Sequence, residues 1–325
     1  MREKGKNIAD ALVVILKNTI IVLSHIIKGI FFTHLWYPRI DVKYNKTAVA
    51  VVDGRLYTGG MTDRFIGIIS LYAWAKTKNI PFRIYYVSPF NLSDYLMPNK
   101  YDWLAKDGDY IKSAKTSIVV YAVGEPRVDR RLNHLNYRKQ IHFYGNRDLL
   151  ENPEYNNYKW GELFKELFKP TDSLQSRIDD IIRDIGSDYF SIVLRFQNLL
   201  GDFHEYDFQA LTTPQEMEDY ISTCLTEVIN LQIRERRVCI VTSDSSTFLN
   251  RVKMIPNVHI IPGKLVHMGT TTDGTYDQYE KSFIDFYILS ESSKIYNIVY
   301  KSMYPSGFPL YASKLNSIPF ERIIL

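Results

Sequence analysis

The stretch SIVLRFQNLLGDF, residues 191–203, begins as a strand and then places an arginine where another aliphatic residue would be expected. Ser191 to Leu194 has the apolar composition of a strand that is buried on both faces. Arg195 follows directly. A buried guanidinium is costly unless it is paired, and its planar fork suits a phosphate or a carboxylate. Arg195 therefore predicts either a structural ion pair, with Asp202 or a helix carboxylate as its partner, or an anion-binding site.

Helices and strands alternate around Arg195. The helix patterns have apolar residues three and four positions apart, and the strand patterns are short apolar runs between turn residues. We expect helices at 171–186, 213–235, 246–254, 276–292 and 306–315, and strands at 189–196, 238–243, 258–262, 294–300 and 321–325. This alternation predicts a doubly wound, mostly parallel sheet with helices on both faces.

The first half of the chain shows the same alternation. Its expected strands are 47–52, 80–87, 117–123 and 139–145, with a helix after the Gly-Gly turn near residue 60. Residues 46–170 thus predict an N-terminal α/β domain, and residues 171–325 a C-terminal Rossmann-like domain. The segment 151–170 is polar, then amphipathic, and is expected to be the linker. We expect the two domains to face a cleft, since ligands bind beyond the carboxyl ends of parallel strands.

Composition fits an ordinary two-domain globular protein. The chain has 325 residues, of which 46% are apolar and 23% charged. Its net charge of +4 is too small to argue for nucleic acid as a partner. Cys224 and Cys239 fall in core-like segments, which predicts reduced structural thiols and a cytoplasmic protein. The seven histidines lack metal-ligand spacing, so we expect no metal site.

Residues 1–45 are expected to form an apolar helix and a connector. The segment starts basic, but Lys17, His25 and Lys28 interrupt its apolar run and no small-residue cleavage site follows, so it does not match a secretory signal peptide. Polar positions recur near every seventh residue and make a narrow stripe on an otherwise apolar helix. This pattern fits a helix packed against the body of the protein. It equally fits a peripheral membrane contact through residues 8–32.

Polar residues also follow two other expected strands of the second domain. They are Ser243, Asp244 and Ser245 after the strand 238–243, and Ser306 and Gly307 before the last helix. A helix start offers unbonded N–H groups and the positive end of a dipole. Serine and aspartate are also common N-caps, so each motif alone fits a plain cap. Together with Arg195, the three strand ends predict a pocket for a diphosphate.

Two loops complete the set of candidates. TGGMTDRF, residues 58–65, is a Gly-Gly turn into a helix and lacks the dinucleotide fingerprint. Gly59 and Gly60 permit close approach of a ligand to the backbone, although a plain turn between strand and helix explains them equally well. The loop 263–278 is long, polar and carries His267; long loops at strand ends are often functional, whereas a lone loop histidine is usually incidental.

Four stretches in this order resemble the fucosyltransferase group of GT-B glycosyltransferases, which includes α1,2-, α1,6- and protein O-fucosyltransferases. The stretches begin at Gly59, Ser191, Val238 and Ser282 and end at Leu315. The arginine that holds the donor diphosphate in that group corresponds to Arg195. Its other motifs correspond to Ser243–Asp244, to Ser306–Phe308, and to Gly59, Gly60, Asp63 and Arg64. Two departures are Val193, where many members have histidine, and the longer spacing from Arg195 to Gly201–Asp202.

The resemblance implies an enzyme that transfers a sugar, fucose from GDP-fucose first, to a glycan acceptor by inversion and without a required metal. It assigns Arg195 as the catalytic residue. The donor-binding residues would be Arg195, Ser243, Asp244, Ser245, Ser306, Gly307, Phe308 and His267, and the acceptor side would carry Gly59, Gly60, Asp63 and Arg64. The base that takes the acceptor proton would be Asp63, Glu125 or Asp202.

Two other functions fit the same sequence. One is a GT-B enzyme that uses another nucleotide sugar, and the other is a non-catalytic, membrane-associated glycan-binding protein of the same fold. For the enzyme, we expect a glycan or lipid-linked glycan acceptor and a role in polysaccharide or glycoconjugate synthesis. The expected location is the cytoplasm, peripherally at the inner face of the membrane. No nucleic-acid partner is expected.

Overall fold

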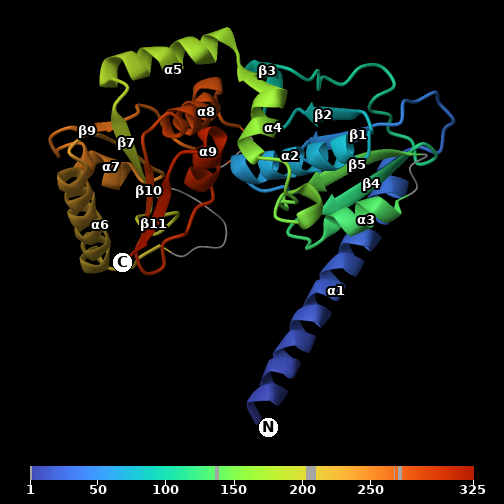
Figure 1. Cartoon of the computed structure of the whole chain (residues 1–325), viewed down its shortest axis with the longest axis horizontal. Helices are drawn as coiled ribbons and strands as arrows, with labels where there is room; N and C mark the ends of the chain where they lie inside the picture. Colours follow the sequence, from blue (N-terminus) through green and yellow to red (C-terminus); the bar gives the residue numbers. More distant parts are fainter. Residues whose placement is uncertain (1, 136–138, 203–209, 267, 270–272) are drawn as a thin grey trace. The chain divides into compact units, whose positions relative to one another are not determined.

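The computed structural model describes residues 2–135, 139–202, 210–266, 268–269 and 273–325. The chain divides into two compact units, coloured along the sequence in Figure 1. Unit 1 comprises Met1–Leu92 and Pro98–Phe168, and unit 2 comprises Ser93–Met97 and Lys169–Leu325. The short segment Ser93–Met97, which we expected in the first domain, thus belongs with the second unit.

Unit 1 is built on a four-stranded parallel sheet in the order β2-β1-β5-β4. Its strands are β1 (Ala48–Val52), β2 (Phe82–Tyr86), β4 (Ser117–Ala122) and β5 (Gln140–Gly145). The helices are α1 (Arg2–Trp36), α2 (Met61–Thr77), α3 (Val128–His134) and α4 (Trp160–Leu167), with short 3-10 turns η1 (Leu92–Asp94) and η2 (Pro153–Tyr155). Because α2 has apolar residues on every side, nearly all of it is buried.

The end of α1 protects the exposed edge of this sheet. β4 is an edge strand, and the amide of its Val119 donates a 2.9 Å hydrogen bond to the Thr33 hydroxyl. Gly29 permits this approach, because a Cβ at residue 29 would lie 2.5 Å from the Val119 carbonyl oxygen. Covering an edge strand in this way prevents pairing with other chains. The last turns of α1 are therefore an integral part of unit 1 (Figure 1).

The segment that we expected to be a linker is folded into unit 1. α4 buries Trp160, Phe164 and Leu167, and Phe164 contacts Phe65 of α2 edge to face at 5.2 Å between ring centroids. The chain leaves unit 1 at Phe168. There β6 (Phe168–Pro170) pairs with β3 (Leu96–Pro98) in a two-stranded sheet.

Unit 2 is built on a five-stranded parallel sheet in the order β11-β10-β7-β8-β9. The strands are β7 (Tyr189–Leu194), β8 (Val238–Ser243), β9 (Val258–Ile260), β10 (Ile295–Val299) and β11 (Phe320–Ile324). The first of these strands in the sequence, β7, is central. β8 and β9 lie on one side of it, and β10 and β11 lie on the other. This is a Rossmann-type strand order, and its topological switch point lies between β7 and β10, which are parallel neighbours.

The helices of unit 2 begin at side-chain caps, apart from the last one, whose N-cap is Gly307. They are α5 (Asp172–Ile185), α6 (Pro214–Glu235), α7 (Ser246–Val252), α8 (Tyr276–Ser290) and α9 (Phe308–Asn316). Thr171, Thr213, Ser245 and Thr275 each accept a hydrogen bond from a first-turn amide. The core includes Phe190, Ile192, Cys224 and Cys239, and both thiols are unoxidised and buried. The predicted fold class, two α/β units with parallel sheets and an apolar N-terminal helix, is confirmed.

Candidate functional site

The candidate site of unit 2 lies at the carboxyl ends of β10, β7 and β8, which are neighbours in the sheet. Arg195 follows β7 at the point where the strand order reverses. Its side chain is 22% exposed, and its Nη1 lies 4.0 Å from Oδ2 of Asp244. In open parallel sheets this switch point is where ligands bind. Arg195 is thus held near an acid but still reaches the surface.

Asp244 supports the loop that carries Arg195. Its two carboxylate oxygens accept hydrogen bonds from the amides of Phe196 (2.8 Å) and Gln197 (2.9 Å). Gln197 has a left-handed backbone, with φ of 54°, so the chain turns sharply directly after the strand. Burial raises the pKa of Asp244, while Arg195 and the two amides oppose the rise. The predicted donor-binding role of Asp244 would compete with these internal bonds.

The start of α7 is occupied by Asp202. One oxygen of this carboxylate accepts hydrogen bonds from the hydroxyls of Ser245 and Ser246 and from the amide of Thr247, at 3.0, 2.9 and 2.6 Å. Ser245 is fully buried and caps the helix, and the Ser243 hydroxyl accepts from the Ser245 amide. An internal anion therefore sits where we predicted that the helix start would receive a phosphate.

At the third strand end, a second arginine holds the loop before α9. Arg322 donates from Nε to Asn297 (3.0 Å) and from Nη2 to the Ser306 carbonyl (2.9 Å). Asn297 in turn donates to the Val193 carbonyl of β7 at 3.0 Å. The Ser306 hydroxyl accepts from the Phe308 amide, and Gly307 is the N-cap of α9. The predicted Ser306–Phe308 element thus adjoins β7 through a polar network.

Sequence reasoning missed Asn297 and Arg322, and it also missed a buried ion pair in α8. Lys281 and Asp285 are 6% and 1% exposed and bond to each other one turn apart. Two features of the sequence could have indicated these residues. They are an asparagine inside the apolar strand 295–299 and a Lys–Asp pair inside an apolar helix, because buried polar groups need internal partners. His267, predicted as a donor-binding residue, lies outside the described residues.

In unit 1, the predicted acceptor-side residues form one local structure. Gly59 has φ of +87°, and a Cβ there would clash with Asp63, so glycine is required. The Asp63 carboxylate accepts from the Gly60 amide at the start of α2. Arg64 is 8% exposed and donates to the carbonyls of Gly59 and Ser88 and to the Tyr86 hydroxyl. These contacts fix the loop between β1 and α2.

Each of the three candidate bases takes part in an internal contact. Asp63 caps α2 and Asp202 caps α7. Glu125 follows β4, is 1% exposed and lies 3.0 Å both from Nδ1 of His25 and from Nη1 of Arg131. Burial raises the pKa of Glu125 to about 7, and Arg131 opposes the rise. Glu125 therefore has the pKa of a general base but lacks access to solvent.

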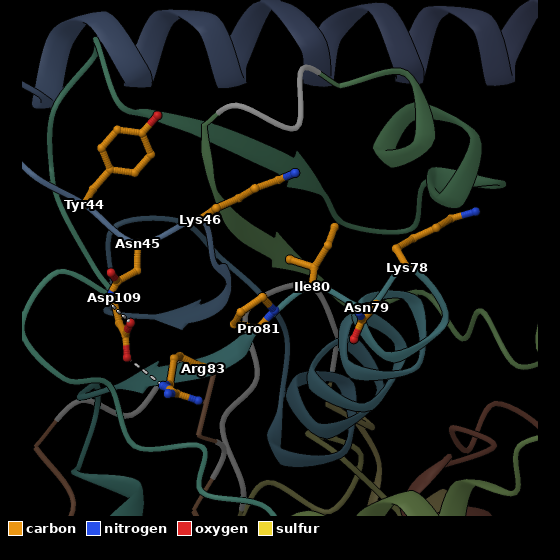
Figure 2. Close-up of a pocket in the computed structure, with 9 residues that line it drawn as sticks. All are labelled: Tyr44, Asn45, Lys46, Lys78, Asn79, Ile80, Pro81, Arg83 and Asp109. Atoms are coloured by element: carbon orange, nitrogen blue, oxygen red, sulfur yellow. Dashed lines mark hydrogen bonds and ion pairs between the residues drawn. The ribbon is translucent and has the colours of Figure 1, made fainter.

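A pocket of about 560 Å³ opens at the other edge of the first sheet, at the amino ends of β1 and β2 (Figure 2). Lys46, Lys78, Asn79, Pro81 and Arg83 are among its lining residues, and Arg83 is paired with Asp109 at 2.6 Å. Because substrates of open parallel sheets bind at the carboxyl ends, we do not assign this pocket to the reaction.

Within the described ranges, no cluster of three or more His, Cys, Asp or Glu side chains could hold a metal ion.

Comparison with known proteins identifies the fold. No protein-family model and no curated protein matches the sequence. Among solved structures, a mutant of FUT1 from Arabidopsis thaliana in complex with GDP matches with a TM-score of 0.54 and 12% identity, over 92% of this chain and 74% of that one. A NodZ α-1,6-fucosyltransferase soaked with GDP-fucose matches with a TM-score of 0.48 and 13% identity, over 84% and 93%. NodZ from Bradyrhizobium is similar at 0.47 and 14%, over 83% and 92%.

The match to the Arabidopsis structure covers nearly the whole chain, so this chain has the fold of a GT-B fucosyltransferase. The resemblance stated from the four sequence stretches is thereby confirmed at the level of the fold. At this identity the likeness extends no further than fold, and the chemistry must be argued from the residues.

Proposed function

We propose that this chain is a glycosyltransferase that moves a sugar from a GDP-sugar, fucose from GDP-fucose first, to a glycan acceptor. The observation that carries the proposal is Arg195: a partly exposed guanidinium at the switch point of unit 2, on a loop fixed by Asp244. The GDP bound in the similar Arabidopsis structure supports a guanosine diphosphate donor.

In the proposed reaction, an acceptor hydroxyl oxygen attacks the anomeric carbon from the face opposite the phosphate. The bond from that carbon to the phosphate oxygen breaks, and GDP leaves with the electron pair. Arg195 would bind the β-phosphate and stabilise the charge that develops on it, which is worth roughly 3–4 kcal/mol for one well-placed donor. With Arg195 supplying this charge, the transfer would need no metal.

The acceptor hydroxyl must lose a proton as it attacks. Asp63 and Asp202 already accept hydrogen bonds from helix starts, so their carboxylates are engaged within the fold. Glu125 is the candidate with a raised pKa, but local opening around His25 would have to expose it before it could act. We therefore propose donor activation by Arg195 as the main contribution of the described residues.

For the biological setting, we propose a glycan or lipid-linked glycan acceptor in polysaccharide or glycoconjugate synthesis. The unoxidised, buried Cys224 and Cys239 support a cytoplasmic location. A cytoplasmic enzyme would draw on the nucleotide sugars made in that compartment.

The donor is tested by thermal shift with GDP, UDP and dTDP in parallel, since a ligand that binds only the folded protein raises its stability. We expect a shift with GDP, and turnover of GDP-fucose with release of GDP. A shift with UDP or dTDP alone would point to another nucleotide sugar. No shift with any nucleotide would favour the non-catalytic glycan-binding protein.

The role of Arg195 is tested with Arg195→Ala, which we expect to reduce turnover at least a hundredfold while circular dichroism remains unchanged. Arg251→Ala is the matched control, because Arg251 is an exposed arginine of unit 2 that pairs with Glu218. Turnover by Arg195→Ala equal to that of the control would refute the mechanism.

A further inference from the structure

The outward face of α1 carries a row of apolar side chains that stay exposed in the described structure. This outward row consists of Val13, Leu16, Ile20, Leu23, Ile27 and Ile30, each at least 50% exposed. Their spacing of three and four residues places them on one side of the helix. Gly29 and Thr33, which contact β4, lie outside this row. A continuous apolar row of this length indicates an interaction surface.

The exposed apolar surface of α1 is wider than this row. Val14, Ile21, Phe31 and Leu35 lie outside it and are between 37% and 61% exposed. A single partner helix would cover the outward row and leave these side chains in water. A lipid bilayer would cover both sets of side chains, because its acyl chains contact the whole width of a helix face that is inserted among them.

A second copy of the chain is the main alternative, since the three-and-four spacing is also that of a two-stranded coiled coil. Two features of the sequence argue against it. From Ala11 to Trp36 there is no acidic residue, so Lys17 and Lys28 would have no complementary charge across such an interface. The row also covers fewer than three heptads. It stops at Ile30, because His34 occupies the position where the next apolar residue would fall.

Charge favours an anionic surface as the partner. Residues 1–28 contain five basic residues, Arg2, Lys4, Lys6, Lys17 and Lys28, and two acidic residues, Glu3 and Asp10, which gives +3. The whole chain carries only +4, so this positive charge is concentrated in the segment that bears the apolar row. Basic residues beside an apolar helix face are attracted to anionic headgroups.

The contacts of α1 limit how far it can enter a bilayer. The stretch Leu16–Trp36, 21 residues with a mean hydropathy of 1.4 and 11% buried, is long and apolar enough to cross a membrane by composition alone. From His25 onward, however, α1 is bonded to unit 1 through Glu125 and Val119. Ala11–Ser24 then remains, about 20 Å of helix against a hydrocarbon core of about 30 Å.

We propose that α1 docks unit 1 on an anionic lipid bilayer, with the outward row inserted into one leaflet and the basic residues at the headgroups. This interaction goes beyond sugar transfer and does not depend on it. It places unit 1 beside the membrane, where a lipid-linked glycan would be presented.

Flotation of the full-length protein with vesicles of phosphatidylcholine, with and without phosphatidylglycerol, tests the proposal. We expect binding to the anionic vesicles, and binding at least a hundredfold weaker for the triple variant Ile20→Gln, Leu23→Gln and Ile27→Gln. Lys17→Gln should weaken binding about fivefold on anionic vesicles only. The matched control substitutes Gln for Ile233, Met254 and Ile324, exposed apolar residues of unit 2, and should bind as the unaltered protein does.

Tryptophan emission shows whether the triple variant is folded, because all four tryptophans lie in unit 1. Equal flotation of the triple variant and the control would overturn the proposal. So would a dimer in light scattering that the triple variant abolishes, combined with no binding to vesicles. An N-terminal tag that becomes protected from protease added outside the vesicles would show crossing and refute insertion into one leaflet. None of these readouts involves nucleotide binding, so they are independent of the transferase activity.

Discussion

At the scale of single residues, ionisation of the buried Glu125 carboxyl lowers the folding stability of unit 1. Its carboxyl holds a proton up to a pKa of about 7 in the folded protein, against 4.5 as its ordinary value. Between these values the folded state binds more protons than the unfolded state, so this group lowers stability as the pH rises from about 4.5 to about 7. The loss approaches about 3 kcal/mol at neutral pH.

Glu125→Gln, which cannot ionise, should therefore gain stability relative to the unaltered protein as the pH rises through that window. The attraction to Arg131 acts only on the ionised carboxylate and is already included in its pKa, so the slope of stability with pH is the prediction. Thermal unfolding followed by tryptophan emission from pH 4.5 to 8 measures it. Glu151→Gln, at an exposed glutamate, serves as the control. A stability difference that stays level over this range would contradict the assignment.

The partner of Arg195 shows what sequence leaves undetermined about a site. The strand end and the need for an acid were predictable, but the acid was expected to be Asp202 or a helix carboxylate. Leu194 of β7 is in register with Ser243 of β8, which brings Asp244 beside residue 195. Asp202 turns instead to the start of α7. The doubly wound parallel sheet followed from the alternation of elements, whereas strand register and side-chain direction depend on three-dimensional packing.

At the scale of elements, Thr33 is expected to hold α1 on the edge of the sheet. Thr33→Val keeps the shape of the side chain but leaves the Val119 amide without its acceptor, which costs about 1–3 kcal/mol. Ser24→Ala is the control on the same helix, because the exposed Ser24 hydroxyl donates to the Ile21 carbonyl one turn earlier. Thermal unfolding should show a lower midpoint for Thr33→Val than for Ser24→Ala. Equal midpoints would mean that this hydrogen bond does not anchor the helix.

Long elements were predictable, whereas several short ones were missed. The expected strand 238–243 and the expected helix 213–235 agree with β8 and α6 to within a residue, because their apolar periodicity extends over several residues. β3, α3 and α4 were missed. α4 has eight residues, and its aromatic pair Trp160 and Phe164 looked like part of a linker until it packed against α2. Short segments take their structure from tertiary contacts, which periodicity does not record.

At the scale of the whole molecule, the division of the chain depends on one short segment. Ser93–Met97 follows 92 residues of unit 1 in the sequence but belongs to unit 2. Tyr95 is 1% exposed and stacks on Tyr276 and Phe283, each at 4.7 Å between ring centroids. Its hydroxyl donates to the Tyr276 carbonyl, and its own carbonyl accepts from the Thr171 amide. A domain boundary predicted from the sequence assigns residues 93–97 to the first domain, because no local pattern in these residues indicates that they pack in unit 2.

Tyr95→Ala should therefore destabilise unit 2, although the residue lies within the stretch of sequence assigned to the first domain. Removal of a buried aromatic ring costs about 3–5 kcal/mol, which lowers the midpoint of unfolding by roughly 10 °C for a unit of this size. Circular dichroism reports on both units, whereas tryptophan emission reports on unit 1 alone. We expect the transition followed by circular dichroism to shift more than the one followed by tryptophan emission. Tyr304→Ala, at an exposed tyrosine of unit 2, is the control, and a Tyr95→Ala midpoint no lower than that of the control would show that this segment does not stabilise unit 2.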